Sequence, residues 1–357
     1  MGEHAGLDVA AVRADLPALA GLVYLNTGTA GPLPRRVRDA MTAALDADLA
    51  RGRASGRRFA RIAEGLREAR ALLAGLVHAD AAEIVLTTGT TDGIQRVLAA
   101  QPWSPGDHVL TTCLEHPDVL EAVRAAARRH NLHVDVAGEP EQSAEEIAAS
   151  VLARIGRARL AVVSHVGYAT GAVLPVERIT AEARRHGALV LVDGAQAVGA
   201  IDVDVAALGA DFYAFPGQKW LLAPEGTGAL VVRGAGLPAS GTSPGLLWAG
   251  LREAVRWRRE HGHQDLLDAV ARGAGLARRL LADIPGVRVL TPARHAGLVA
   301  FRVPGADPLG VAAELGARRI AVRGIPESDA VRLSCGPFTT EDELVLAARA
   351  VAEVTGR

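Results

Sequence analysis

Short apolar runs rich in Val, Ile and Leu alternate with segments of helical periodicity through the first two thirds of the chain. The runs are continuously apolar, which is typical of strands that are buried on both faces. Strands of this kind, separated by helices, form parallel sheets with helices on both sides. We therefore expect an α/β fold with a mostly parallel, seven-stranded sheet. The expected strands are residues 84–88, 108–112, 132–138, 160–166, 188–194, 212–215 and 228–233.

The pattern changes after about Gly241, where a long helical stretch leads into short apolar runs and a last helix. This change indicates a smaller α+β domain, with a linker near residues 234–246. Thr339 or Thr340, together with Glu343, is placed to cap the last helix. The expected boundaries are 35–245 for the large domain, and 1–34 with 246–357 for the small one.

The composition is that of a globular protein without a strongly charged or membrane-spanning part. The chain has 357 residues, of which 49% are hydrophobic, and a net charge of −1. No apolar run approaches the ~20 residues of a spanning helix, and the acidic, amphipathic N-terminus is unlike a signal peptide. Cys113 and Cys335 form no disulfide framework, and His261 with His263 lacks a third metal ligand. We expect a cytoplasmic protein that binds neither nucleic acid, membrane nor metal.

The chain has a single lysine, Lys219, although Lys and Arg together number 39. It lies in the stretch FPGQKWLL, shortly before a buried strand. Arginine serves wherever only a positive charge is needed, whereas lysine can lose its proton when desolvated and form a Schiff base. Lys219 is therefore either a chance surface residue or a reactive amine.

Polar residues follow the ends of several expected strands, at the edge where open parallel sheets bind ligands. Thr88, Thr90 and Thr91 in TTGTTDG precede a helix, so they form either a phosphate cradle or a simple N-cap. His116 precedes Pro117 at the next strand-to-helix turn. Its imidazole is either structural or able to stack on a flat ligand or move a proton.

Asp193 ends the apolar run ALVLVD, and Gln196 follows three residues later. This aspartate is either a turn residue or a carboxylate directed at a buried cation. Pyridoxal phosphate (PLP) accounts for all of these features together. It has a phosphate, a flat ring, a pyridinium nitrogen that needs an anionic partner, and an aldehyde that reacts with lysine.

Six motifs, in their order and spacing, resemble the class V aminotransferases, which are fold-type I PLP enzymes. The motifs are TTGTTDG, LEHPDV, SHVGYATGAVLPV, LVDGAQAVGAIDVDV, DFYAFPGQKWLLAPEGTGALVVR and VRLSCGPFTTEDE. This family includes cysteine desulfurases, cystine C–S lyases and isopenicillin N epimerase-like proteins, and the N-terminal YLNTGTAGPLP also resembles the last subgroup. The resemblance extends from about Leu22 to Ala352 and implies the fold-type I architecture.

The resemblance implies a role for each matching residue around the cofactor. Lys219 would hold PLP as an internal aldimine, Asp193 would pair with the pyridinium nitrogen, and His116 would stack on the ring. Gln196 would lie near the ring hydroxyl. The residues implied to bind the phosphate are Thr90, Thr91 and Gln218, with Gly241 and Thr242 supplied by the second subunit of a homodimer.

The same resemblance implies the substrate side of the site. Arg332 matches the arginine that grips the substrate carboxylate, a task that suits its bidentate fork. Asn26 and Tyr168 are implied to lie near the substrate, and Tyr168 is either an acid or a gate there. The family often has Ser or Thr where this chain has Pro216, so one possible phosphate ligand is absent.

The implied reaction passes through an external aldimine of an amino acid, from which Lys219 removes the Cα proton. Cysteine desulfurases carry a catalytic cysteine before the VRLS strand, but segment 322–334 has none, and Cys113 and Cys335 do not match it. We therefore expect a C–S lyase that performs β-elimination on a cysteine-type substrate. An aminotransferase or an epimerase is the alternative within the family. A non-catalytic PLP-binding protein and a cofactor-free lysine aldolase are the alternatives outside it.

Overall fold

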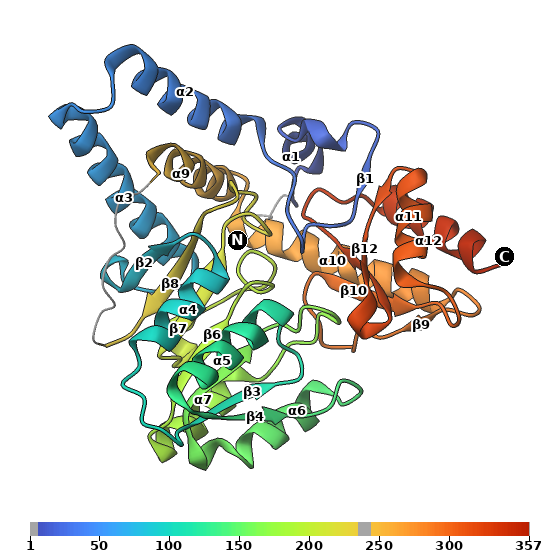
Figure 1. Ribbon diagram of the computed structural model, residues 1–357. Coiled ribbons are helices and arrows are strands. Elements are labelled where there is room, and N and C mark those ends of the chain that lie inside the picture. Colours follow the sequence, from blue (N-terminus) through green and yellow to red (C-terminus); the bar gives the residue numbers. More distant parts are fainter. Residues whose placement is uncertain (1–5, 235–243, 357) are drawn as a thin grey trace, which may run out of the picture.

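The computed structural model describes residues 6–234 and 244–356 (Figure 1). Its larger sheet has seven strands in the order β2-β8-β7-β6-β5-β3-β4. Their bounds are β2 (Ile84–Thr87), β3 (His108–Thr112), β4 (His133–Ala137), β5 (Ala158–Ser164), β6 (Leu189–Asp193), β7 (Phe212–Pro216) and β8 (Gly228–Val232). Neighbours from β4 to β7 are parallel, whereas β8 runs antiparallel to both β7 and β2. The prediction of a mostly parallel, seven-stranded sheet is confirmed.

Helices cover both faces of this sheet because the strands are apolar on both faces. In β5, Val162 and Val163 face opposite sides, as successive residues of a strand do. Val162 belongs to an apolar cluster with α4 (Thr90–Ala100) and α5 (Pro117–His130). Val163 belongs to another cluster, with α3 (Gly56–Leu76), α6 (Ala144–Leu152) and α7 (Val176–His186). The sheet is therefore the middle of three layers.

A second sheet of four antiparallel strands lies in the C-terminal part, in the order β12-β13-β10-β9. Its strands are β9 (Arg288–Val289), β10 (Leu298–Arg302), β12 (Arg323–Ile325) and β13 (Ala330–Ser334). A separate apolar cluster joins it to α10 (His263–Ala282), α11 (Pro308–Ala317) and α12 (Glu341–Thr355). Near the N-terminus, β1 (Val23–Tyr24) pairs with β11 (Ile320–Ala321), so the N-terminal segment lies beside this C-terminal part (Figure 1).

The remaining helices are short or lie outside the groups described above. They are α1 (Val9–Ala14), α2 (Arg35–Arg51), α8 (Val205–Leu208) and α9 (Gly245–Glu260), with 3-10 helices at Pro17–Leu19, Ala81–Glu83, Ile155–Arg157 and Pro326–Ser328. α9 packs against α2 and α3, and the ends at which α2 and α3 are joined project from the rest of the molecule in Figure 1. The domain boundaries given above stay a prediction. Among the helices of the described ranges, none is both long and apolar enough to cross a membrane.

The last helix begins with the capping arrangement that the sequence predicts. The Thr340 hydroxyl accepts a hydrogen bond from the Glu343 backbone N–H at 3.3 Å, and the Glu343 carboxylate accepts one from the Thr340 N–H at 2.9 Å. Two backbone donors that a helix start leaves unpaired are thereby satisfied. The prediction is confirmed, with Thr340 and not Thr339 as the cap.

The parallel strands end at one edge of the larger sheet. Thr112, Ser164, Asp193 and Pro216 are the last residues of β3, β5, β6 and β7. The loops that follow these strand ends lie together, and this edge is where open α/β sheets bind their ligands.

Candidate active site

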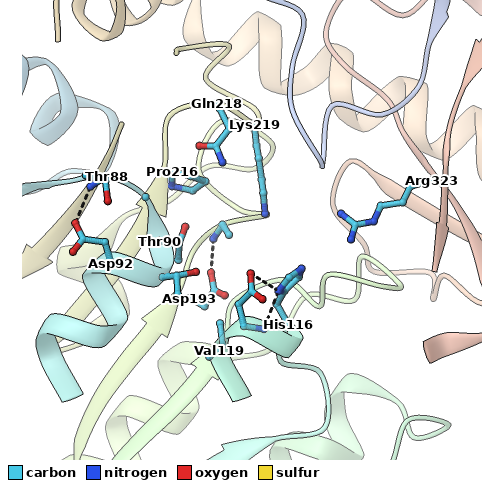
Figure 2. A pocket seen from close by; sticks show the side chains of 14 residues that line it. Thr88, Thr90, Asp92, His116, Val119, Asp193, Pro216, Gln218, Lys219 and Arg323 are labelled. Carbon is cyan, nitrogen blue, oxygen red and sulfur yellow. Dashed lines mark hydrogen bonds and ion pairs between the residues drawn. The ribbon is translucent and has the colours of Figure 1, made fainter. Parts of the chain in front are cut away.

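A cavity of about 480 Å³ lies at this edge of the sheet (Figure 2). Seven of the predicted site residues line it, namely Thr88, Thr90, Thr91, His116, Asp193, Gln218 and Lys219. They come from four different strand-to-helix or strand-to-loop connections, and the fold brings them to one place. Arg323, which the sequence analysis did not select, also lines the cavity.

Lys219 follows β7 through a short turn, and its side chain reaches into the middle of the cavity (Figure 2). Burial lowers the pKa of its amine to about 8, although the charge of Asp193 acts in the opposite direction. The adjoining turn is held in place from the N-terminal segment, because the Gly31 N–H donates to the Gln218 carbonyl at 2.7 Å. A buried amine with a lowered pKa is available in its neutral, nucleophilic form near neutral pH.

Asp193 is fully buried at the end of β6. One carboxylate oxygen accepts a hydrogen bond from the Ala195 N–H at 2.8 Å. Burial raises the pKa of Asp193, while Lys219 and the Ala195 N–H lower it. The carboxylate therefore has a fixed orientation, and its position on the cavity wall suits it to bind a cationic ring nitrogen.

His116 is the N-cap of α5, and Pro117 is the first helical residue, where its missing N–H costs nothing. Its Nδ1 accepts a hydrogen bond from the Asp118 N–H at 3.2 Å, which assigns the ring proton to Nε2. Burial lowers the pKa of His116, and Lys219 lowers it further, so the ring is neutral. The Tyr168 ring lies edge-on at 5.0 Å from it. A neutral imidazole held in this way can stack on a flat ligand.

The start of α4 has the properties of a phosphate site. Its N-cap, Gly89, has no side chain that could cap the helix. The first backbone N–H groups of α4 are therefore available to bind an anion at the positive end of the helix dipole. The Thr90 hydroxyl and the Gln218 side-chain oxygen are buried without a hydrogen-bond partner. Asp92 does not oppose an anion here, because it is paired with Arg96 at 2.8 Å. The Thr90 hydroxyl and the Gln218 amide nitrogen can both donate to a phosphate, and Lys219 in the same cavity fits the aldehyde of PLP.

Two neighbouring arginines lie on strands of the smaller sheet, and one of them, Arg323, lines the cavity. Arg332 on β13 is fully buried, and its Nη1 and Nη2 atoms donate to the Tyr168 carbonyl at 2.6 Å and to the Thr29 hydroxyl at 3.2 Å. Burial lowers the pKa of Arg332 to about 9, and the charge of Arg323 lowers it further. Arg323, its neighbour on β12, also donates to the Thr29 hydroxyl, at 3.4 Å. Arg323 lines the cavity and Arg332 does not, and the two guanidinium groups share the Thr29 hydroxyl as a hydrogen-bond partner. A guanidinium group can bind a carboxylate through two parallel hydrogen bonds.

Arg323 could have been found from the sequence by the same reasoning that selected Arg332. Both arginines interrupt apolar runs near the C-terminus, in RRIAVRG and AVRLSCG. The antiparallel register that places them opposite each other, however, was not deducible from either run alone.

Besides Arg332, three predicted residues do not line the cavity. The Gln196 side chain is buried, donates to the Gly28 carbonyl at 2.9 Å and accepts from the Trp220 indole N–H at 2.9 Å. The Tyr168 hydroxyl donates to Glu327 at 3.1 Å, and burial raises its pKa to about 12. The Asn26 side-chain oxygen accepts a hydrogen bond from the Thr29 hydroxyl. Their predicted roles stay predictions, and Gly241 and Thr242 lie outside the described residues.

The two cysteines, and the pair His261 and His263, do not line the cavity. Neither cysteine lines the cavity, and burial raises the pKa of Cys113 to about 11 and that of Cys335 to about 12. His263 accepts a hydrogen bond from Arg258 at 2.8 Å. Within residues 6–234 and 244–356, no group of three or more His, Cys, Asp or Glu side chains could hold a metal ion.

Known proteins are similar to this chain in sequence and in fold. The family model "Aminotransferase class-V" matches residues 23–239 and 237–344. The isopenicillin N epimerase of Streptomyces clavuligerus is 32% identical, over 94% of this chain and 95% of that protein.

Two solved structures are similar over almost the whole chain. A mutant of C-DES with glycine covalently linked to its PLP cofactor has a TM-score of 0.89 and 29% identity, and covers 95% of this chain and 98% of that one. A complex of the cystine C–S lyase C-DES with its product cysteine persulfide has a TM-score of 0.87 and 30% identity, and covers 94% and 99%.

The fold, the cavity and the comparisons agree. The helix start with its unpaired polar groups, the neutral imidazole, the buried carboxylate and the single lysine fit PLP, which is the cofactor. The chain belongs to the class-V aminotransferase family and has its fold-type I architecture.

Proposed function

We propose that this protein is a C–S lyase that performs β-elimination on a cysteine-type amino acid. The observation that carries the proposal is the composition of the cavity: it contains Lys219, Asp193, His116 and Arg323, and neither of the chain's cysteines lines it. Such a site can bind an amino acid and remove its Cα proton, but it provides no thiol for a protein-bound persulfide.

The residues of the large sheet hold the cofactor in this proposal. Thr90, Gln218 and the start of α4 bind the phosphate, and His116 stacks on the ring. Asp193 keeps a proton on the ring nitrogen, because a buried carboxylate is stabilised by a cation. When bound, PLP supplies an aldehyde that condenses with the substrate amine and a ring that takes up the electron pair left at Cα.

The two arginines select the substrate. Arg332 binds the α-carboxylate, for which its fully buried guanidinium has a donor without a partner in Nε. Arg323 provides a second cation on the same side of the cavity, which suits a substrate with two carboxylates. A disulfide-linked amino acid such as cystine has this charge pattern, and cystine is the substrate class named for C-DES.

Lys219 moves the proton in the reaction. Its Nζ atom takes the proton from Cα of the substrate, and the Cβ–S bond then breaks with both bonding electrons leaving on sulfur. From cystine, the sulfur fragment leaves as cysteine persulfide, and the other fragment is the three-carbon enamine 2-aminoacrylate. Water hydrolyses this enamine to pyruvate and ammonia. No external oxidant or reductant is needed, because the S–S bond of cystine stays intact and becomes the S–S bond of the persulfide.

A second candidate function is amino-acid epimerisation. The observation in its favour is the similarity to isopenicillin N epimerase over 94% of this chain. An epimerase would return the proton to the opposite face of Cα and leave the carbon skeleton whole. Transamination, the third reaction of the family, would consume a keto acid. A protein that only binds PLP would have no use for a buried carboxylate-binding arginine.

We also propose a homodimer that shares its active sites. Large apolar side chains are exposed on α2 and α3, among them Leu45, Leu49 (84% exposed) and Phe59. Exposed apolar groups on packed, projecting helices are typical of an interface between subunits. α9 packs against these two helices and begins at Gly245, just after the segment that contains Thr242.

The test is a product assay on the purified holoenzyme. Cystine, cysteine, S-substituted cysteines and common amino acids are each incubated without a keto acid, and pyruvate, ammonia and sulfide are measured. The elimination proposal expects pyruvate from cystine in an amount equal to the ammonia, and none from the Lys219→Ala control. Inversion of a chiral amino acid without pyruvate would establish the epimerase instead. Keto-acid dependence of every product would establish the aminotransferase.

A further inference from the structure

Glu115 is a buried carboxyl group next to the cavity-lining residue His116. It immediately precedes His116 in the turn between β3 and α5. Although the two residues are adjacent, the His116 ring lines the cavity while the Glu115 side chain turns inward and is only 2% exposed. A carboxyl group is seldom buried without a specific reason, because desolvation disfavours its charged form.

The hydrogen bonds of Glu115 join two strand ends. Its Oε1 accepts from the Thr112 hydroxyl at 2.6 Å and from the Ser164 N–H at 2.8 Å, and its Oε2 accepts from the Ser164 hydroxyl at 2.7 Å. Thr112 ends β3 and Ser164 ends β5, and these strands are neighbours in the sheet. One side chain therefore connects the two strands at the point where both stop pairing.

Each of these strand ends lies next to a residue that lines the cavity. The turn from Thr112 carries His116, and its Leu114 N–H also donates to the Thr112 hydroxyl, at 3.2 Å. Ser164 is paired with Asp193 across the β5–β6 register. The hydrogen bonds of Glu115 thus lie between the imidazole on one side and the carboxylate on the other.

We propose that Glu115 is a positioning residue of the cofactor site, which fixes the spacing between His116 and Asp193 by tying the ends of β3 and β5 together. Glu115 touches neither cofactor nor substrate and acts through these two residues. The proposal rests on the PLP site and not on the reaction assigned to it, so it stands whether the enzyme is a lyase or an epimerase.

The charge of Glu115 is secondary to its shape. Burial raises its pKa to about 7, with a further increase from Asp193, while the hydrogen bonds from Thr112 and Ser164 lower it. The neutral form is therefore populated near neutral pH. Glutamine reproduces that form: its oxygen can accept the two bonds of Oε1, and its amide can donate to the Ser164 hydroxyl.

The experiment compares Glu115→Ala with Glu115→Gln. We expect Glu115→Ala to weaken PLP binding to the apoprotein about tenfold. The visible circular dichroism signal, measured per molecule of bound PLP, should also change. Glu115→Gln should stay within about threefold of wild type and keep its spectrum. Both are measured without substrate, so the result is independent of the catalytic activity.

Thr180→Val is the matched control for loss of a buried hydrogen bond. The Thr180 hydroxyl on α7 donates to the Leu208 carbonyl at 2.5 Å, and the residue does not line the cavity. The Thr180→Val substitution should lower the melting temperature of the protein and leave its PLP affinity and visible circular dichroism unchanged. Ser164→Ala, which removes one of the three hydrogen bonds, should weaken PLP binding less than Glu115→Ala and replaces it if that variant does not fold. Wild-type affinity in both alanine variants, or a glutamine variant as weak as the alanine variant, would overturn the proposal.

Discussion

Lys219 lines the cofactor cavity, and the partial desolvation of its amine there changes its acid–base behaviour. An ordinary lysine titrates near 10.4, whereas burial lowers the pKa of Lys219 to about 8 against the opposing charge of Asp193. The amine reacts with an aldehyde only when it is neutral. Its reactivity therefore increases as the pH rises through about 8, well below the range of an exposed lysine.

The first prediction concerns uptake of PLP by the apoprotein. The rate of covalent capture should rise with pH and level off above about 8. Asp193→Asn removes the charge that raises the pKa of Lys219, so its midpoint should move to lower pH. Stopped-flow absorbance measures the rate, with Nα-acetyl-lysine as the control for titration of PLP itself. A rate that keeps rising beyond pH ~10, as for an exposed lysine, contradicts this prediction.

A second prediction at this scale concerns Arg332. Arg332→Ala removes the buried guanidinium proposed to bind the α-carboxylate, and a charged hydrogen-bonding partner contributes roughly 1.5–3 kcal/mol. KM for the amino-acid substrate should rise about tenfold or more, with a smaller change in PLP affinity.

The matched control for Arg332 is Arg302→Ala on the adjacent strand β10. Arg302 pairs with Asp329 at 2.8 Å and does not line the cavity. Steady-state kinetics of both variants give the comparison. Equal KM values for wild type and Arg332→Ala would remove Arg332 from substrate binding.

At the scale of elements, a threonine lies at the start of both α12 and α4, but its hydroxyl has a different role in each helix. Thr340 caps α12 with its hydroxyl and contributes to stability. Thr90 begins α4, but its hydroxyl is buried without a hydrogen-bond partner, and Gly89 before it provides no cap. A helix start without a cap is less stable, because its first N–H groups have no intrahelical partner, but the same groups can bind an anion.

The third prediction follows from this contrast. Thr340→Ala should lower the free energy of unfolding by about 1 kcal/mol and leave PLP affinity unchanged. Thr90→Ala should leave the stability of the apoprotein unchanged, because no hydrogen bond is lost, yet weaken PLP binding roughly tenfold. Urea unfolding of the apoproteins and titration with PLP measure the two effects. Loss of apoprotein stability in Thr90→Ala would show that its hydroxyl serves the helix instead.

The proposed homodimer with shared sites belongs to the scale of the whole molecule. In that arrangement each cavity takes Lys219 from one subunit and Thr242 from the other. The exposed Leu45, Leu49 and Phe59 on the projecting helices α2 and α3 supply apolar surface for the contact. The active site would then be complete only in the dimer.

The fourth prediction is that two inactive variants complement each other. Lys219→Ala and Thr242→Ala, mixed and refolded together, should recover about one quarter of wild-type activity, because about half of the dimers are hybrid and each hybrid has one intact site. Neither variant alone should reach this level. Leu49→Glu should shift the protein toward the monomer in analytical ultracentrifugation. Activity of the mixture no greater than the mean of its components would contradict a shared site.

The sequence by itself determined the fold class and the cofactor. Continuous apolar runs separated by helical segments can bury both faces only in a covered, mostly parallel sheet, and Asp193, His116 and Lys219 each follow the end of such a run. Because parallel strands place their carboxyl ends at one edge, residues far apart in the chain were predictable as neighbours.

Only the tertiary structure decided which side chains face the cavity and which support it from outside. Arg323 reaches the cavity because an antiparallel register sets it beside Arg332, and Gln196 turns away because Gly28 and Trp220 take both ends of its amide. Glu115, adjacent to His116, faces Ser164 instead. These outcomes depend on contacts between distant segments, and hydrophobic periodicity, which reports only the local exposure of each element, contains no information about them.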